Sequence, residues 1–345
     1  MDAGYTKSEV DSIWVFTHSS WGIAQNSGCV RTKHVSYYLG IDGGGTKTTC
    51  AVGDESKTLA TATAGPSNIV RVGEARARES LQQAVRQACA SAGIGLAQVK
   101  HTCVGGAGSA RPELATTVRG ILAEVLSSSI DVVGDMEIAL EAAFGAGPGV
   151  IVIAGTGSIA YGRDQHGNTE RAGGWGFAIG DEGSAHWIGR EVVRAVLRAS
   201  DEAANAAGFS GNNLAAALCK TWDVKSVADL AHAANSVPPP DFASLFPAIA
   251  ASDDDLALQV LSSAGLELAR IAAIVIRRLF SAGFKNEVKT PAAKIPVAMI
   301  GSVFRHAARG KESFYNEVRR LDSRAEISPE IVEPVEGALR MARAK

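Results

Sequence analysis

A strand, a glycine turn and a second strand occur twice in this sequence, and this repeat constrains the fold more than any other feature. The first copy is "YYLGIDGGGTKTTCAVGD" at residues 37–54, and the second is "VIVIAGTGSIAYGRD" at residues 150–164. In each copy apolar residues precede the turn and small or β-branched residues come after it, which predicts a β-hairpin. Two such units, roughly a hundred residues apart, predict an internal duplication.

Both glycine turns suit the binding of phosphate groups. Successive backbone N–H groups can hold phosphate oxygens where no side chain blocks the approach and where the turn can take a positive φ, as glycine allows. One such turn more often only joins a hairpin, but two at matching places favour a shared ligand. A Walker loop or a dinucleotide fingerprint needs a helix after the glycines, whereas a strand occurs there in this sequence. The candidates are Gly43, Gly44, Gly45, Thr46, Gly155, Thr156 and Gly157.

Two aspartates stand at predicted strand ends. Asp42 directly precedes the first glycines, where a carboxylate either attracts Mg²⁺ that bridges phosphate oxygens or makes hydrogen bonds within the turn. Asp135 ends the strand "IDVVGD" where the helix "MEIALEAAF" begins. It either caps that helix or accepts a proton from an attacking hydroxyl group. Asn68, in the turn "GPSN", either fixes the turn or offers both a donor and an acceptor to a ligand.

The stretch "RAGGWGFAIGDEGSAHWIG", residues 171–189, combines glycines with aromatic and acidic side chains. Trp175 with Asp181 and Glu182 suits a sugar, because sugar hydroxyls need acceptors and the sugar ring has an apolar face. We expect Trp187, on the next helix, to pack in the core. We expect His186 to pack or cap locally, since no second ligand stands at metal spacing.

Composition excludes several other classes of function. The 345 residues are 46% hydrophobic, enough for about two domains, and the net charge of -2 includes no basic stripe for nucleic acid. The five cysteines are scattered and never form a C-x-x-C pair, which predicts neither a disulfide framework nor a zinc site and favours a reducing cytoplasm. The apolar window Ile13–Phe16 is too short for a signal peptide, and we expect no membrane span.

The remaining patterns organise the chain. Helices are predicted over residues 74–92, ending at Gly93, and over residues 184–200. Residues 256–279 predict one long helix or a helix pair, and "IPVAMIGSV" predicts a late buried strand. Residues 1–34 hold no sustained period, so we interpret them as an extension outside the fold whose deletion spares folding and activity.

Six motifs together resemble one known family. "GIDGGGTKT", "GPSNI", "VGDMEIALEAAFG", "VIVIAGTGSIAYG", "GGWGFAIGDEGSAHWIG" and "AMIGSVF" occur in that order, and the resemblance to the N-acetylglucosamine kinases and the broader BadF/BadG/BcrA/BcrD ATPases covers the chain from about Val35 onward. It implies an α/β fold of two actin-like, ribonuclease H-like lobes with an ATP cleft between them. The lobes would span residues 35–147 and 148–345, the second with helical insertions, and residues 1–34 would be peripheral.

The resemblance also implies a reaction: transfer of phosphate from ATP, with Mg²⁺, to the 6-hydroxyl of an amino sugar, foremost N-acetylglucosamine. Glucosamine, N-acetylmuramic acid, and a sensing protein without catalysis stay open as alternatives. Paired cluster cysteines, which the family's activators of acyl-CoA dehydratases need, are absent, and residues 205–255 match no motif that would locate the adenine pocket. Homodimers are common in the family; neither a nucleic-acid nor a membrane partner is expected.

The resemblance implies roles residue by residue. Asp135 would be the catalytic base, and Asp42 would bind Mg²⁺ directly or through water. The ATP residues would be the seven candidates of the two glycine turns together with Gly301 and Ser302. The sugar residues would be Asn68, Asp135, Ser158, Ile159, Gly174, Trp175, Gly176, Asp181 and Glu182.

Overall fold

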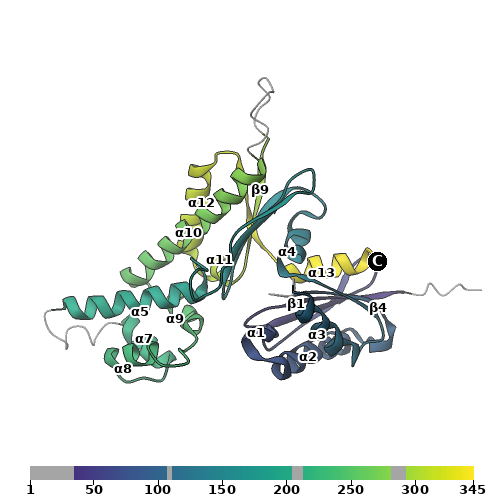
Figure 1. Cartoon of the computed structure of the whole chain (residues 1–345), viewed down its shortest axis with the longest axis horizontal. Coiled ribbons are helices and arrows are strands. Elements are labelled where there is room, and N and C mark those ends of the chain that lie inside the picture. The colour runs from purple at the N-terminus through teal and green to yellow at the C-terminus, as the bar shows by residue number, and fades with distance from the viewer. Residues whose placement is uncertain (1–34, 107–110, 204–212, 281–292) are drawn as a thin grey trace, which may run out of the picture. The chain divides into compact units, whose positions relative to one another are not determined.

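The computed structural model describes residues 35–106, 111–203, 213–280 and 293–345, so the proposed extension at residues 1–34 lies outside them. Ten strands of the described residues form two five-stranded sheets (Figure 1). The first sheet contains β1 (Tyr37–Gly43), β2 (Thr48–Gly53), β3 (Thr58–Ala64), β4 (Val99–Gly106) and β5 (Ser129–Gly134). The second contains β6 (Gly149–Ala154), β7 (Ser158–Arg163), β8 (Thr169–Gly173), β9 (Ile295–Ile300) and β10 (Ala325–Val332).

The two sheets have the same strand order. The first runs β3-β2-β1-β4-β5, and the second, read from its β8 edge, runs β8-β7-β6-β9-β10. In the first sheet β1, β2 and β3 are antiparallel neighbours, and β4 and β5 run parallel to β1. In the second sheet β6, β7 and β8 are antiparallel neighbours, and β9 and β10 run parallel to β6. The predicted hairpins are therefore confirmed as β1–β2 and β6–β7, and the shared order agrees with the predicted duplication.

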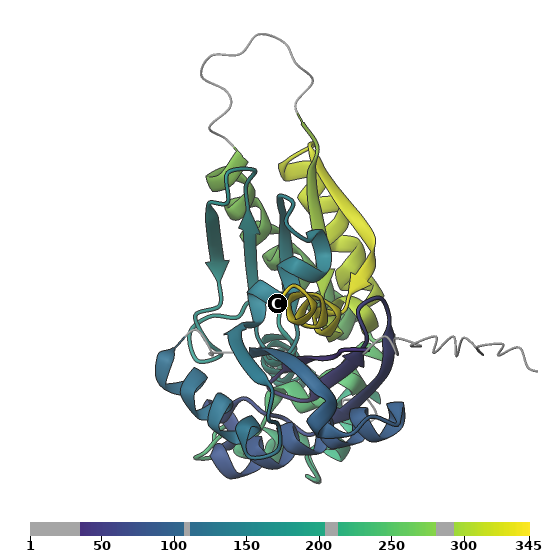
Figure 2. The ribbon, with the colours of Figure 1, turned by 90° about the vertical axis from the view of Figure 1, so that its right-hand side faces the viewer.

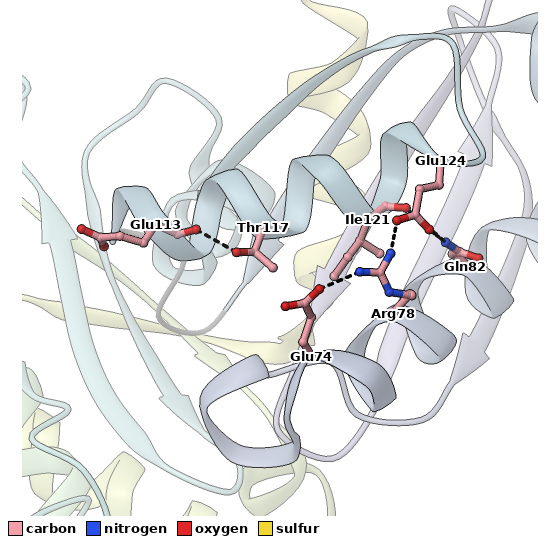
Figure 3. Close-up of polar contacts among 7 residues, drawn as sticks. All are labelled: Glu74, Arg78, Gln82, Glu113, Thr117, Ile121 and Glu124. Carbon is pink, nitrogen blue, oxygen red and sulfur yellow. Dashed lines mark hydrogen bonds and ion pairs between the residues drawn. The ribbon is translucent and has the colours of Figure 1, made fainter.

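One face of the first sheet is covered by α2 (Glu74–Ala92) and α3 (Pro112–Ala123). The short helix α1 (Ile69–Val72) precedes α2, and the short helix η1 (Leu96–Gln98) precedes β4. α2 ends at Gly93, which has a left-handed backbone, as predicted. Figure 3 shows polar contacts of α2 and α3: Arg78 pairs with Glu74 within α2, and both Arg78 and Gln82 (2.8 Å) donate to Glu124, which directly follows α3. These contacts hold the two helices over the sheet.

The second half adds a group of helices between β8 and β9 and two more before β10. The long α10 packs on β6, β7 and β8 and against α12, and it is one continuous helix rather than a pair. The elements are α5 (Ala185–Glu202), α7 (Asn213–Thr221), α8 (Val227–Ala234), η2 (Phe242–Leu245), α9 (Phe246–Ala250), α10 (Asp255–Phe280), α11 (Ser302–His306) and α12 (Ala308–Leu321).

α10 is also the one helix in the described part of the chain that is long and apolar enough to cross a membrane, which corrects the expectation that no segment has this property. Glu267 and Arg270 interrupt the apolar run in the sequence, but the mean hydropathy of the best window is still 1.5. Half of that window is buried inside the protein, where Leu261 and Leu268 join the core of the second sheet. A buried core helix has the same composition as a membrane span.

The helix that comes after the fifth strand of the second sheet packs on the opposite sheet, and the helix after the fifth strand of the first sheet packs on both sheets. α13 (Pro334–Arg343) comes after β10 but lies on β1, β2 and β4, and α4 (Asp135–Phe144) comes after β5 but places Leu140 beside Ile151 of β6 (Figures 1 and 2). α4 and α13 pack against each other so closely that a Cβ on Gly337 would lie 2.0 Å from the carbonyl oxygen of Ile138. The lobe boundary between residues 147 and 148 stays a prediction. α13 belongs to the second lobe by its place in the sequence, but it packs on the first sheet.

Candidate active site

Strand topology brings two acidic side chains to one edge of the first sheet. Asp42 of β1 pairs with Gly105 of β4, which pairs with Val133 of β5, and Asp135 follows β5 directly. Burial and, next in size, the negative charge of Asp135 raise the pKa of Asp42 to about 7, against the opposing charge of Lys47. The two carboxyl groups therefore interact at the carboxyl ends of parallel strands, where α/β folds bind ligands.

The surroundings of Asp42 favour a cation over the alternative of a turn hydrogen bond. Burial and neighbouring charges set its pKa, with no hydrogen bond among the causes. Mg²⁺ uses one or two carboxylates and takes its other ligands from phosphate and water. Two buried carboxyl groups that repel each other fit this requirement. No group of three or more metal-ligating side chains occurs within residues that the structure describes, so a cation here would depend on phosphate oxygens.

Asp135 does not cap the helix that it begins. The N-cap of α4 is Gly134, whose N–H donates to Oε1 of Glu137 (3.2 Å), and Asp135 is the first helical residue. Oδ1 of Asp135 accepts a hydrogen bond from the N–H of Met136 (3.0 Å). Burial nevertheless raises the pKa of Asp135. A carboxylate with a raised pKa is better suited to accept a proton near neutral pH.

The turn glycines do not use a positive φ, which corrects the sequence interpretation, and two of them stand close to neighbouring side chains. A Cβ on Gly157 would lie 2.8 Å from Oδ2 of Asp181, and one on Gly43 would lie 2.8 Å from Oγ of Ser67, whereas no atom lies within 4 Å of a Cβ on Gly155. None of the five turn glycines has a positive φ: Gly43, Gly44, Gly45, Gly155 and Gly157.

The two turns meet through their threonines. Oγ1 of Thr46 lies 2.7 Å from Oγ1 of Thr156, one hydroxyl from each half of the molecule. Asn68 adjoins the first turn, since its N–H donates to the carbonyl of Gly44 (3.3 Å). Oδ1 of Asn68 is buried, and the described residues give it no hydrogen-bond partner. A buried acceptor without a partner is costly in a protein, which makes Asn68 a candidate for ligand binding.

The loop before α5 is tied to the second turn. Oδ1 of Asp181 accepts from the N–H of Gly176 (3.3 Å), and Oγ of Ser158 donates to the carbonyl of Glu182 (2.8 Å). Asp181 is buried and has a φ of 59°, a left-handed angle that is strained for a residue other than glycine. Burial raises its pKa. Strain of this kind gathers at ligand sites, so the loop is a candidate binding segment.

The aromatic residues of this loop divide as expected. Trp175 is 67% exposed, with the guanidinium of Arg171 4.7 Å from its ring centroid, so it does not pack in the core. Trp187 does pack against the core of the second sheet. His186 packs between Phe177 and Phe242, with ring centroids 5.0 and 5.3 Å away, and burial lowers its pKa.

The remaining predicted residues also border the second turn. Ile159 comes after Ser158 in β7, and its side chain fills the space beside Gly174. Gly301 ends β9 with a φ of 105°, and a Cβ there would lie 2.3 Å from the carbonyl oxygen of Ala154. Ser302 then begins α11. The structure thus brings the second-half candidates together, and the contact of Thr46 with Thr156 joins them to the first-half candidates.

Glu333 is an acidic residue that the sequence analysis missed. It directly follows β10, and its charge raises the pKa of Asp42. Nη2 of Arg305 lies 2.5 Å from its Oε1. β10 was not predicted because "AEISPEIV" is polar and shifts register between Ile327 and Ile331. The duplication carries a usable signal, since Asp135 and Glu333 both come directly after the fifth strand of their sheet.

Residues 39–342 match the BadF/BadG/BcrA/BcrD ATPase family. The chain belongs to this family. Over 170 residues it is 37% identical to the N-acetylmuramic acid/N-acetylglucosamine kinase of Clostridium acetobutylicum, covering 49% of this chain and 56% of that protein. Over 183 residues it is 34% identical to the N-acetyl-D-glucosamine kinase of Dictyostelium discoideum, covering 48% of this chain and 55% of that protein. The chain thus spans about half the length of the curated relatives it matches.

Solved structures of other proteins share the fold of this BadF/BadG/BcrA/BcrD ATPase. A Chromobacterium violaceum protein provisionally named N-acetylglucosamine kinase superposes with a TM-score of 0.65 at 21% identity, over 90% of this chain and 99% of that one. The glucose complex of Balamuthia mandrillaris glucokinase superposes with a TM-score of 0.52 at 12% identity, over 91% of this chain and 95% of that one. Likeness at these identities concerns the fold alone, and it confirms the predicted α/β class with two sheets.

Proposed function

We propose that this protein transfers the γ-phosphoryl group of ATP to the 6-hydroxyl of an amino sugar, with N-acetylglucosamine as the preferred acceptor. The observation that carries the proposal is the meeting of two glycine turns, through Thr46 and Thr156, beside the interacting acids Asp42 and Asp135. Membership of a family whose curated relatives are named as N-acetylglucosamine kinases supports the acceptor.

The described residues divide between the two substrates. The two turns hold the phosphates of ATP, and the strand end at Gly301 and Ser302 lies along the adenosine. The sugar binds against Asn68, whose buried Oδ1 would accept a hydroxyl or amide hydrogen. The other sugar contacts would come from Ser158, Ile159, Gly174, Trp175, Gly176, Asp181 and Glu182.

The reaction would need one proton acceptor and much positive charge. The sugar oxygen forms a bond to the γ-phosphorus as the bond from that phosphorus to the bridging oxygen of ADP breaks, and the hydroxyl proton passes to Asp135. Hydroxyl donors at Thr46 and Thr156 and backbone N–H groups of the turns would balance charge on the phosphoryl oxygens. Closure of the two halves would keep water away.

Mg²⁺ fits the acidic edge of the first sheet. Asp42 would hold the ion directly or through water, and Asp135 lies close enough for its charge to raise the pKa of Asp42. When bound, Mg²⁺ supplies positive charge that neutralises phosphate oxygens during transfer. Asp42 contributes its carboxylate to that binding, and Lys47 opposes the charge of the same carboxyl group.

One alternative acceptor is favoured by a specific observation. The Clostridium acetobutylicum relative is named for both N-acetylmuramic acid and N-acetylglucosamine. A kinase for N-acetylmuramic acid or glucosamine therefore stays the nearest rival, and a sensing protein without turnover is the rival of another class. The two acids together with both turns support the enzyme over the sensor.

A panel of acceptors separates these functions. The purified full chain is mixed with ATP and Mg²⁺ and with N-acetylglucosamine, N-acetylmuramic acid, glucosamine or glucose, and ADP release is recorded. We expect the highest kcat/KM with N-acetylglucosamine. Higher kcat/KM with another sugar would change the acceptor, whereas thermal stabilisation by sugar without any ADP release would support the sensor.

Cellular and domain assignments complete the proposal. We propose a cytoplasmic enzyme whose partner is the small amino sugar, built from lobes at residues 35–147 and 148–345, with residues 1–34 dispensable. A homodimer is the expected assembly by analogy with the family. Sedimentation of the full chain, and activity after removal of residues 1–34, test the last two points.

A further inference from the structure

Arg71 is a cation beside the first glycine turn that the proposed roles do not use. It lies in α1, one turn after Asn68, whose carbonyl accepts from the N–H of Arg71 (2.9 Å). Nη1 of Arg71 lies 3.4 Å, and Cδ 3.7 Å, from where a Cβ on Gly45 would stand. Its side chain is 33% exposed. The guanidinium therefore lies against the turn, and its Nη1 faces the turn backbone.

The other terminal nitrogen of Arg71 is held from the second half. Nη2 pairs with Oδ2 of Asp241 at 2.7 Å. Asp241 is the N-cap of η2, and its Oδ1 accepts from the N–H of Ala243 (3.1 Å), so the carboxylate has a fixed place. The pair leaves Nη1 free of Asp241 and directed toward the turn. The Asp241 side chain is 47% exposed, and its hydrogen bond from Ala243 restricts the carboxylate and with it the guanidinium that it pairs with.

Further donors gather at the same place. Oγ1 of Thr156 lies 3.8 Å from the same Cβ position on Gly45, and it contacts Oγ1 of Thr46 at 2.7 Å. Two hydroxyls, one from each half, thus stand beside the guanidinium. A tetrahedral phosphoryl group with three oxygens matches such a set, and the planar guanidinium is the side chain best suited to bind phosphate through two hydrogen bonds.

The balance of charge also calls for a cation at this place. The negative charges of Asp135 and Glu333 both act on Asp42 at the sheet edge. An incoming triphosphate adds several negative charges, and phosphoryl transfer depends chiefly on neutralising them. The positive charge of Lys47 lowers the pKa of Asp42, so this cation is directed to the acids of the sheet edge. Nη1 of Arg71, 3.4 Å from the Cβ position of Gly45, places a second cation beside the turn, where it could bind phosphate.

We propose that Arg71 binds the γ-phosphoryl group of ATP through Nη1 and that Asp241 is the positioning residue that holds its guanidinium over the first glycine turn. The inference rests on the proposed function only as far as the two turns bind ATP. The proposed ligand of Arg71 is the γ-phosphate, which ATP has and ADP lacks, so Arg71 should distinguish the two nucleotides. Asp241, from the other half, then affects ATP recognition without touching ATP.

The test compares affinities for ADP and for a non-hydrolysable ATP analogue, both with Mg²⁺ and without sugar, by calorimetry on the full chain. We expect Arg71→Gln to weaken analogue binding 10- to 100-fold and ADP binding less than 3-fold, because charge-assisted hydrogen bonds of this type carry such factors. Arg71→Lys should recover part of the loss. Asp241→Asn, which keeps an oxygen for the N-cap, should weaken analogue binding about 3- to 10-fold.

Arg76→Gln is the matched control, because Arg76 is an exposed arginine five residues further along the chain. It should leave both affinities within 2-fold. An unchanged ratio of analogue to ADP affinity in Arg71→Gln would overturn the proposal, as would equal losses for both nucleotides, which indicate a structural role. Because no sugar is present, failure of every acceptor to react would refute the kinase assignment and leave this result standing.

Discussion

The two halves of the molecule share a strand order but differ in the surroundings of the acid that stands after the fifth strand. In the first half Asp135 begins α4, and its carboxyl group interacts with Asp42. In the second half Glu333 precedes α13 and pairs with Arg305 instead. Duplication therefore provides two topologically matching acids, while local partners determine which one is available for chemistry.

Removal of the first acid tests this difference most severely. Asp135→Asn should lower kcat with N-acetylglucosamine by about 10²- to 10⁴-fold, because an amide cannot accept the proton. Steady-state ADP release measures the loss, and thermal unfolding verifies the fold. Near-normal turnover in a folded variant would remove Asp135 from the role of base.

The second prediction concerns the crossing of α4 and α13. Gly337→Ala should lower the free energy of unfolding by about 2–3 kcal/mol, because its Cβ would stand 2.0 Å from the carbonyl oxygen of Ile138. Gly120→Ala is the matched control on α3, since no atom lies within 4 Å of its Cβ position. It should raise stability by up to about 1 kcal/mol. Urea unfolding that gives both variants the same sign would contradict this close crossing.

The third prediction uses the pH dependence of Asp42. Its folded pKa of about 7 exceeds the usual value near 3.8, so the folded protein binds an extra proton between these values and loses stability as pH rises through them. Asp42→Asn should therefore raise Tm in Mg²⁺-free buffer by about 2–5 °C at pH 8 and by much less at pH 4.5. An advantage of equal size at both pH values would show that ionisation of Asp42 is not its cause.

The smallest effect is expected at the second acid. Glu333→Gln should change kcat by less than about 5-fold, because Glu333 raises the pKa of Asp42 only as the last of several causes. Because Glu333 raises the pKa of Asp42, the variant should have a lower pKa at Asp42, and Tm measured from pH 4.5 to 8 would detect this change. A loss as large as that of Asp135→Asn would make the two halves equivalent in catalysis.

Much of this arrangement could be predicted from local sequence, and the rest depends on contacts distant along the chain. Apolar runs around the glycines predict both hairpins, and the strand-helix junction predicts the place of Asp135. The pairing of Arg71 with Asp241 has no local pattern, since the two residues belong to different halves. The positive φ that the sequence suggested for the glycine turns was wrong, and the nearness of Asp181 to Gly157 is a contact that no local pattern predicts.

The position of α13 also could not be predicted. Its sequence "PVEGALRMAR" indicates a helix with one apolar face, but that face fits either sheet by composition. Only the close passage of Gly337 along Ile138, and of Leu339 along Gly40 of β1, selects the first sheet. Such selection comes from shape complementarity of surfaces that are far apart in the chain.

The packing of α13 on the first sheet has a consequence for the order in which the protein can form during synthesis. The core of Tyr38, Ala51 and Ile138 is completed by Val335 and Leu339, which the ribosome adds only after the whole second sheet. At usual elongation rates the interval from α4 to α13 lasts roughly 10–40 s. During that time α4, through Ile138, covers only part of this face of the first sheet, so the nascent first half exposes apolar surface of the kind that chaperones bind.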